Sequence, residues 1–487
     1  MKKWFRIETA VAACSIAAIL AFLYVVTGRL FFQYDLEWTE GGLLLAAERL
    51  ASGQSLYVRP TLDYVPFAYP PVFLSIVAFW IPIVGKGFHV ARAVSVFYLL
   101  VAAACLWIGL RGRRGLARLA ALGLFFAAFG ATGGIYDLAL PDSTALGLFA
   151  VAYLLCGGGA RPSLVRGMVA GLFGFLSAMT YQPYLFYAAG LFAILLLSHR
   201  PSGVAALATL GALTAAAAAW GLSQQGWPLV YISTIPFKAW LYSDKPLLEG
   251  LRELVQNFAP LLLIAFWGVA RDRKEEGAPF TRRYGTGLFL GMVVLGSIVH
   301  FSEPEAGSRG FVLIAWLLAL LAGRELDAAL GPEPEGASVK PRPSRQGILV
   351  VLGLGFLALL YRPSSQLPDS IDLWVGNSML SKLQLFEGRV LIPQHPYTLV
   401  LAGKQPNFHL GALEMYQKAG LQLPKDFFLP IARQEFSFAV TDGKIAIQEL
   451  GNAYMLHQSI DIPGNALLEK TGRKTRPSQI LVPQPKK

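Results

Sequence analysis

The sequence predicts an all-α polytopic membrane protein of about eleven transmembrane helices, with a re-entrant or juxtamembrane helix and a small carboxyl-terminal α/β domain. Hydrophobic residues make up 54% of the chain and charged residues 15%, whereas soluble domains carry about 25% charged residues. Apolar runs long enough to cross a bilayer core of ~30 Å recur between residues 7 and 361. Beyond Tyr361 the long runs stop and the composition becomes mixed.

The first apolar run, Ile7–Thr27, follows a basic amino terminus that contains Lys2, Lys3 and Arg6. A secretory signal has the same arrangement, but this run is about 20 residues long and lacks a small-x-small cleavage site after it. We therefore expect it to remain as the first helix, with the amino terminus in the cytoplasm.

Basic residues gather between the later apolar runs, in clusters at residues 111–118, 161–166, 199–200, 271–283 and 324–345. Because cytoplasmic loops carry an excess of Lys and Arg, we expect all these clusters on the cytoplasmic side. This requires the run at 70–85, which contains Pro82, to be re-entrant or interfacial instead of a crossing. The net charge of +12 is then explained by topology, and nucleic acid is not indicated as a partner.

After the first helix, the expected crossings lie near residues 90–110, 116–131, 143–157, 166–181, 183–198, 203–221, 257–271, 285–301, 309–323 and 347–361. This topology places four segments on the external side, at residues 33–69, 131–142, 221–256 and 362–487. We therefore expect a transmembrane domain over residues 1–361, with the functional site in its outer loops, and a soluble extracytoplasmic domain over residues 362–487.

Residues 34–42, which we call the first acidic segment, hold Asp35, Glu37 and Glu40 between Tyr and Trp residues. Carboxylates beside aromatic rings at a membrane interface suit a site for a polar group carried on a lipid. An ordinary solvated loop before a helix, where acids are also favoured, explains the segment equally well.

Residues 136–144, the second acidic segment, contain Asp137 and Asp142 at the predicted outer mouth of two helices. Asp142 also fits a capping residue of the helix that follows it. Two acidic segments on one side of the membrane nevertheless favour a shared site.

Several stretches occur in a characteristic order: the first helix, the first acidic segment, EGGLLLAAERLASGQSLY at 40–57, FAYPPVF at 67–73 and LPDSTALGLFA at 140–150. Together they resemble the C-type superfamily of polytopic glycosyltransferases, in particular the dolichyl- or undecaprenyl-phosphate sugar transferases. These include the protein O-mannosyltransferases and the lipid A aminoarabinose transferase. The resemblance covers about residues 1–200, and more loosely 303–323 and the tail.

The resemblance implies a glycosyltransferase of the bacterial inner membrane. It would move a sugar from a polyprenyl-phosphate donor to a lipid, glycan or protein acceptor on the outer face. Glu40 matches the Glu of the family's Asp-Glu pair, but Thr39 occupies the Asp position. Either Asp35 or Glu37 has taken the role of the missing Asp, or the donor is bound differently.

Asp142 matches the acidic residue of the family's second outer loop, and Tyr181 stands where relatives often have a lysine. The residues expected to contact the substrate are Asp137, Asp142, Arg59, Tyr69, Lys238 and Arg309.

A polyprenyl monophosphate is a good leaving group, so the reaction needs a base more than an acid. A carboxylate that removes the proton of the acceptor hydroxyl contributes roughly 10²–10⁴ in rate. The candidate catalytic residues are Glu40, Glu37 and Asp35.

The departing phosphate needs positive charge or oriented donors. The cationic candidates in the external segments are Arg59, Lys238, Lys245 and Arg309. Snorkelling at the start of a helix would also explain Arg309. A divalent cation held by Asp35, Glu37 or Asp142 would serve equally, but no spacing requires one, and the three cysteines have no paired spacing for a disulfide or zinc site.

In residues 362–487, the sequence pattern predicts strands at Arg389–Ile392, Phe436–Thr441 and Lys444–Gln448, and a helix near Leu410–Ala419. The turn at 441–444 suggests that the last two strands form a hairpin. Nothing in this domain indicates catalysis, and acceptor recognition or stability is its expected role.

Two other classes of function stay open. A transporter or flippase of a lipid-linked sugar predicts ionisable residues at mid-membrane and internal repeats; here the acids lie in loops and no repeat is evident. A non-catalytic envelope-assembly scaffold would tolerate Thr39 at the family's Asp position.

Overall fold

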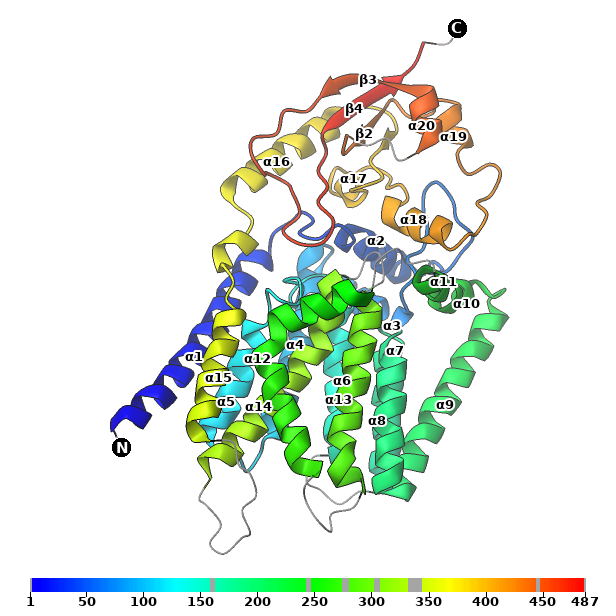
Figure 1. The fold of residues 1–487 in the computed structure, drawn as a ribbon. Helices are drawn as coiled ribbons and strands as arrows, with labels where there is room; N and C mark the ends of the chain where they lie inside the picture. The colour runs from blue at the N-terminus through cyan, green and yellow to red at the C-terminus, as the bar shows by residue number, and fades with distance from the viewer. Residues whose placement is uncertain are drawn as a thin grey trace, which may run out of the picture.

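The computed structural model describes residues 2–157, 163–241, 247–273, 280–301, 307–331, 344–443 and 447–485. A bundle of helices makes up most of the molecule, and a small sheet with its own short helices covers one end of the bundle (Figure 1). We call this the sheet end. The amino terminus lies at the opposite end.

The first half of the bundle consists of α1 (Lys2–Arg29), α2 (Glu40–Ala51), α3 (Pro71–Val84), α4 (Phe88–Gly109), α5 (Gly115–Ala127), α6 (Asp142–Gly157), α7 (Leu164–Ala178), α8 (Tyr184–Ser198) and α9 (Arg200–Ser223). The second half consists of α10 (Trp227–Leu229), α11 (Ile235–Leu241), α12 (Leu247–Arg273), α13 (Phe280–Phe301), α14 (Val312–Leu330) and α15 (Arg345–Ala358). Every apolar run predicted to cross the membrane overlaps one of these helices.

Among the described residues, four helices are long and apolar enough to span a membrane: α1, α4, α9 and α12. A fifth span is counted if α15 and residues 363–385, which meet at a bend of 44°, form one unit. The mostly helical membrane fold is therefore confirmed, whereas the total of about eleven crossings stays a prediction. The run at 70–85 forms α3, a helix of 14 residues with Pro82 inside it.

Two glycines let α2 pack tightly against its surroundings. A Cβ atom on Gly42 would lie 2.3 Å from the Phe67 ring and 2.9 Å from His409. One on Gly41 would lie 2.7 Å from the Asp35 carboxylate and 2.9 Å from Tyr397. The glycine pair after Glu40 therefore has a packing role, because only residues without a side chain fit there.

The carboxyl-terminal part contains α16 (Ser370–Leu385), β1 (Val390–Leu391), α17 (Tyr397–Leu401), α18 (Leu410–Lys418), α19 (Leu429–Ala432), β2 (Phe438–Thr441), α20 (Gln448–Ala453), β3 (Tyr454–Ser459) and β4 (Gln479–Pro483). The strand order is β1-β2-β4-β3, with β1 and β2 parallel and the other pairs antiparallel. Strands β1 and β2 and helix α18 confirm the sequence predictions.

The predicted hairpin is wrong. Strand β2 pairs with β1 and β4, and Gln448 begins a helix instead of ending a strand. Residues 444–446 lie outside the described part of the chain. The turn signal at Asp442-Gly443 is real, but the partner of β2 comes from the far end of the chain, which no local pattern could reveal.

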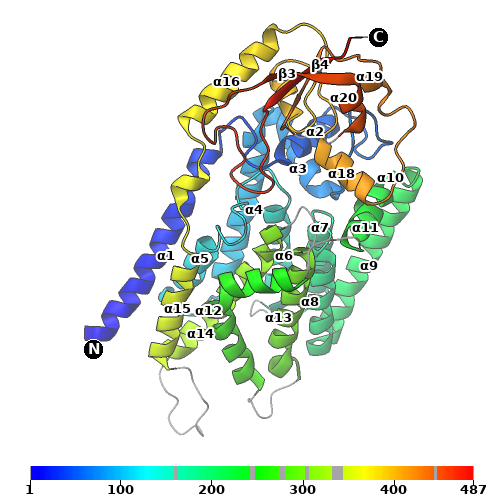
Figure 2. The ribbon, with the colours of Figure 1, turned by 45° about the horizontal axis from the view of Figure 1, so that its top comes forward.

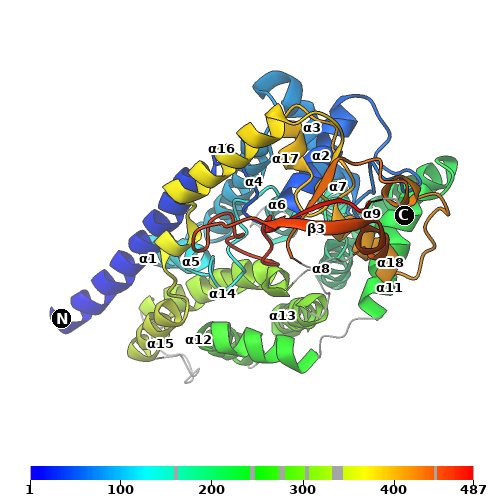
Figure 3. The same cartoon turned by 90° about the horizontal axis from the view of Figure 1, so that it is seen from above.

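The carboxyl-terminal part is anchored on the first loops of the bundle. Helix α17 packs on α2, and α18 packs on α11, as Figures 1 and 2 show for α18 and α11. The Tyr397 hydroxyl donates to the Glu48 carboxylate at 2.6 Å, and Phe408 N–H donates to Leu62 C=O at 2.9 Å. Viewed from above, the sheet lies over part of the bundle and leaves α12 and α13 uncovered (Figure 3).

Candidate functional site

The two acidic segments meet at the sheet end. The Glu40 carboxylate, at the start of α2, accepts a hydrogen bond of 2.7 Å from the backbone N–H of Ala139 in the second acidic segment. The proximity that the sequence predicted is therefore present, although the segments lie about a hundred residues apart in the chain.

Glu40 forms a two-pronged ion pair with Arg92 of α4, and both side chains are completely buried. The Arg92 Nε and Nη2 atoms donate to its two oxygens at 2.9 and 2.7 Å. A further N–H, from Leu36, donates to Glu40 at 2.9 Å. Burial raises the pKa of Glu40, but the charge of Arg92 and these hydrogen bonds outweigh it, so the pKa is lowered.

Asp137 pairs with Arg29, the last residue of α1, at 2.8 Å, and this pair is also buried. Arg29 donates further hydrogen bonds to the carbonyl oxygens of Gly134 and Gln366, at 2.7 and 2.8 Å. Asp137 thus fixes the second acidic segment to the end of α1. Asp137 and Glu40 were predicted from the sequence, but their arginine partners were not. These arginines lie inside or at the end of apolar helices.

Asp142 pairs with Arg309, which a short 3₁₀ turn places just before α14. The Arg309 Nη2 atom lies 2.7 Å from the Asp142 carboxylate, and Nη1 lies 3.4 Å from the Tyr69 hydroxyl. Arg309 is only 7% exposed, so snorkelling into water does not explain it. Three predicted substrate-binding residues, Asp142, Arg309 and Tyr69, are therefore together.

Glu37 is buried beside this group. Its Oε2 atom accepts hydrogen bonds from Thr39, at 2.7 Å from the backbone N–H and 2.6 Å from the hydroxyl. Burial raises the pKa of Glu37 to about 7, although the nearby charge of Arg309 acts in the opposite direction. Thr39 thus holds the carboxylate of Glu37.

Asp35 points toward the carboxyl-terminal part. One carboxylate oxygen accepts from Gly41 N–H at 2.8 Å, and the other lies 3.3 Å from Nδ1 of His395. Burial raises the pKa of Asp35, against the effect of His395.

A cavity of about 1090 Å³ opens next to Arg309, among helices α7, α8, α9, α11 and α13. Most of its lining is apolar, as with Phe175, Leu185 and Leu295. Its polar lining includes Tyr69, Gln182, Lys238, His300, Arg309 and Lys418. Lys418 comes from α18, and the sequence analysis did not predict it. An apolar space with cationic groups in its wall suits a lipid that carries an anionic group.

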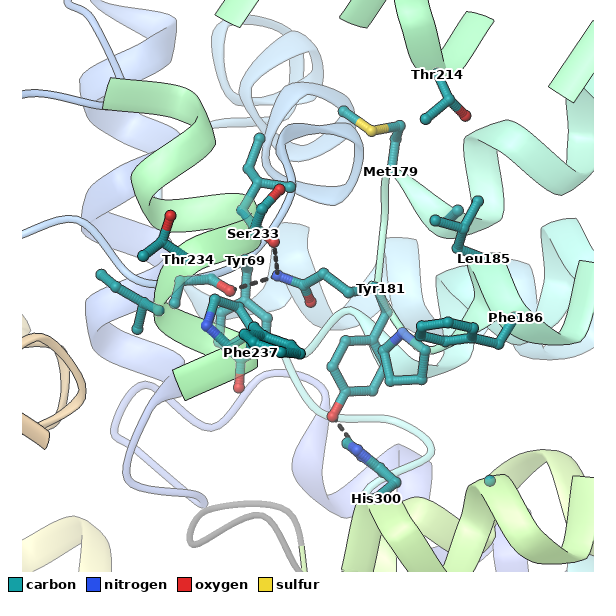
Figure 4. Close-up of a pocket in the computed structure, with 18 of the residues that line it drawn as sticks. Tyr69, Met179, Tyr181, Leu185, Phe186, Thr214, Ser233, Thr234, Phe237 and His300 are labelled. Atoms are coloured by element: carbon teal, nitrogen blue, oxygen red, sulfur yellow. Dashed lines mark hydrogen bonds between the residues drawn. The ribbon is translucent and has the colours of Figure 1, made fainter. Parts of the chain in front are cut away.

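Figure 4 shows how the wall of the cavity is fixed near Tyr69. The Gln182 side-chain amide donates to the carbonyl oxygens of Ala68 and Ile232, at 2.7 and 3.3 Å. The Tyr181 hydroxyl lies 2.5 Å from Nε2 of His300. His300 is thus a buried histidine with a partner.

The remaining candidates lie elsewhere. Arg59 is exposed to solvent, and it does not line the cavity. Lys245 lies outside the described residues. Within the described ranges, no group of three or more His, Cys, Asp or Glu side chains could hold a metal ion.

The fold and the site together define a polytopic membrane protein with buried acid–arginine pairs at the sheet end, one of which, Asp142–Arg309, adjoins an apolar cavity. No protein-family model and no curated protein matches the chain. Among solved structures, the fold is similar to that of ArnT from Cupriavidus metallidurans. The crystal structure bound to undecaprenyl phosphate has a TM-score of 0.58 and 12% identity, covering 97% of this chain and 98% of ArnT.

The crystal structure of the same ArnT in the apo state has a TM-score of 0.57 and 15% identity, with the same coverage. The similarity is one of fold, and it extends over nearly the whole of both chains. It confirms, at the level of fold, the resemblance that the sequence motifs suggested.

Proposed function

We propose that this protein is a membrane glycosyltransferase that moves a sugar from a polyprenyl-phosphate donor to a hydroxyl group of a lipid, glycan or protein acceptor. One observation carries the proposal: an apolar cavity adjoins Arg309, which is paired with Asp142. The positive charge of Arg309 also acts to lower the pKa of buried Glu37. The donor's chain fits the apolar part, and its phosphate fits the cationic part. ArnT, which has the same fold, was crystallised with undecaprenyl phosphate.

The phosphate would be held by more than one cation. Asp142 pairs with Arg309, and Lys238 and Lys418 line the same cavity, so we expect both lysines to contact the phosphate as well. Both lysines would stabilise the negative charge that develops on the phosphate as its bond to the sugar breaks. In this scheme the carboxyl-terminal part contributes Lys418 to donor binding.

Among the three candidate carboxylates, Glu37 has the properties of the base. Its pKa of about 7 lies near the working pH, where a general base is most effective. The oxygens of Glu40 are taken up by Arg92 and backbone N–H groups, so Glu40 serves to position the segment. Asp35 is engaged with His395.

We further propose that the site faces away from the cytoplasm of a bacterial inner membrane. Helix α4 begins at the sheet end, where Phe88 packs on Tyr397 with 5.0 Å between ring centroids. It therefore delivers Arg111, Arg113 and Arg114 to the opposite end, where the amino terminus also lies (Figure 1). The positive-inside rule makes that end cytoplasmic.

A divalent cation is the alternative source of positive charge. Its predicted ligands, Asp35, Glu37 and Asp142, already bind His395, Thr39 and Arg309 respectively. Comparing transfer in EDTA with transfer in Mg²⁺ tests this alternative. Loss of activity in EDTA that Mg²⁺ restores would show that a cation takes part.

The proposal is tested by incubating the purified protein with a panel of radiolabelled polyprenyl-phosphate sugars and scoring transfer or hydrolysis. We expect turnover of one donor, and a loss of roughly 10²–10⁴ in rate for Glu37→Gln. Glu387→Gln, at an exposed glutamate, is the matched control and should keep full activity. Movement of an intact lipid-linked sugar across liposomes would identify a transporter, and neither activity would favour a scaffold.

A further inference from the structure

A buried cluster of polar groups joins the first acidic segment to the carboxyl-terminal part. His395 lies at its centre, with Nδ1 3.3 Å from Asp35 and Nε2 3.1 Å from the Thr475 hydroxyl and 3.5 Å from Glu469. The side chains of His395, Asp35 and Glu469 are 7%, 9% and 1% exposed. Burying a histidine between two carboxylates costs free energy unless the charges are paired. The arrangement therefore indicates a specific role for His395.

Glu469 and Thr475 also define a loop between β3 and β4. The Glu469 carboxylate accepts hydrogen bonds from both the backbone N–H and the hydroxyl of Thr475. These bonds hold the two ends of the segment 469–475 together, and we call this segment the strap. His395 touches both ends of the strap and, through Asp35, the bundle.

The strap runs alongside the first acidic segment. Lys470 N–H donates to Leu36 C=O at 2.9 Å, and Thr471 forms an isolated parallel bridge with Glu37. The guanidinium of Arg473 lies 4.3 Å from the centre of the Trp38 ring. Three consecutive residues of the first acidic segment are thus contacted by the strap.

The strap also approaches the Glu37 carboxylate itself. Gly472 has φ +70°, and a Cβ atom there would lie 2.9 Å from Oε1 of Glu37. Thr471 donates a hydrogen bond to Gly133 C=O, close to the second acidic segment. The strap therefore touches the proposed base and the chain leading to Asp137, and any movement of the strap would move Glu37.

We propose that His395 is a positioning residue, which locks the strap to Asp35 and thereby holds the Glu37 carboxylate in its working position. This inference rests on the proposed function, because it takes Glu37 as the base. The imidazole ring bridges the two carboxylates. Burial acts to lower the pKa of His395, but the negative charges of Asp35, Glu469 and Asp442 outweigh it and raise the pKa. The carboxyl-terminal part is then a component of the active site and not only a cover.

The test compares His395→Ala and Asp35→Asn with the unaltered protein, in steady-state transfer and in hydrogen–deuterium exchange. We expect kcat to fall about 10- to 100-fold, because a small displacement of a catalytic group is costly, with the KM for the donor nearly unchanged. We also expect the amides of the strap to exchange at least about tenfold faster, while those of β2 and β4 keep their protection.

His457→Gln, at an exposed histidine of β3, is the control and should change neither quantity. Unchanged strap exchange in both variants, or an unchanged kcat with a raised KM, would overturn the proposal. If the unaltered protein turns over no donor, the proposed function fails, and the exchange data still decide whether His395 locks the strap. Should His395→Ala not fold, Asp35→Asn removes the same link from the other side.

Discussion

Glu37 and Glu40 are three positions apart, yet their surroundings give the two carboxylates different chemistry. Glu40 faces a buried arginine with matching geometry, and its pKa is lowered. Glu37 is buried, its Oε2 atom accepts hydrogen bonds from Thr39, and burial raises its pKa to about 7. One carboxylate is thereby fixed in its charged form, and the other can take up and release a proton near neutral pH.

This difference predicts a pH profile. A general base acts in its deprotonated form, so kcat/KM should rise with pH up to the pKa of Glu37, which is about 7, and level off above it. Below that pH the rate should fall about tenfold per pH unit. The measurement is transfer between pH 5 and 9, and a profile that is flat across pH 7 would count against Glu37 as the base.

Glu40 should matter for stability more than for chemistry. Glu40→Gln leaves Arg92 buried without a charged partner, and breaking such a pair costs about 3–5 kcal/mol. Thermal unfolding in detergent should therefore begin at a clearly lower temperature than for the unaltered protein. If Glu40→Gln melts normally but loses transfer, Glu40 and not Glu37 is the base.

At the scale of elements, the helices could be predicted from sequence and their partners could not. Apolar runs bounded by Gly, Pro and basic residues gave the positions of α4 to α9 because a long apolar run has few other ways to satisfy its backbone in lipid. The pairing of β2 with β4 and the strap depend on contacts between distant parts of the chain. Arg29 and Arg92 were missed for the same reason, since their partners lie far away in sequence.

The strap makes a prediction at this scale. Gly472→Ala places a methyl group against Glu37 and should lower kcat about 10- to 100-fold. Gly464→Ala is the matched control, because Gly464 also has a positive φ, +55°, but has nothing within 4 Å of the added atom. Both variants carry similar backbone strain, so an equal loss of activity in the two would mean that strain, and not contact with Glu37, is responsible.

At the scale of the whole molecule, the proposed site combines three regions that lie far apart in the sequence. In the proposed mechanism the first acidic segment supplies the base, whereas the membrane helices line the cavity and the carboxyl-terminal part adds Lys418 and the strap. The two acidic segments, which the sequence placed on one side of the membrane, meet at the sheet end, and two of the predicted cations, Arg309 and Lys238, line one cavity. The sequence predicted acceptor recognition or stability for the carboxyl-terminal part, and no catalytic role, because the residues that we propose it contributes are single residues without a motif.

The cavity predicts how donor binding responds to its volume. Ala218 of α9 lines the cavity, so Ala218→Trp should fill part of it and raise the KM for the donor at least about tenfold, which corresponds to about 1.4 kcal/mol. The kcat should change little, because the isoprenoid chain of the donor is bound equally in the ground state and in the transition state. Ala219→Trp, at an exposed neighbour, should leave both constants unchanged, and equal effects at the two positions would contradict the cavity assignment.

The most direct test is an experimental structure of the protein with a bound polyprenyl phosphate. The account predicts the isoprenoid chain among α7, α8, α9 and α13, and the phosphate in contact with Arg309 and with Lys238 or Lys418. A phosphate bound away from Arg309, with the cavity left empty, would contradict it.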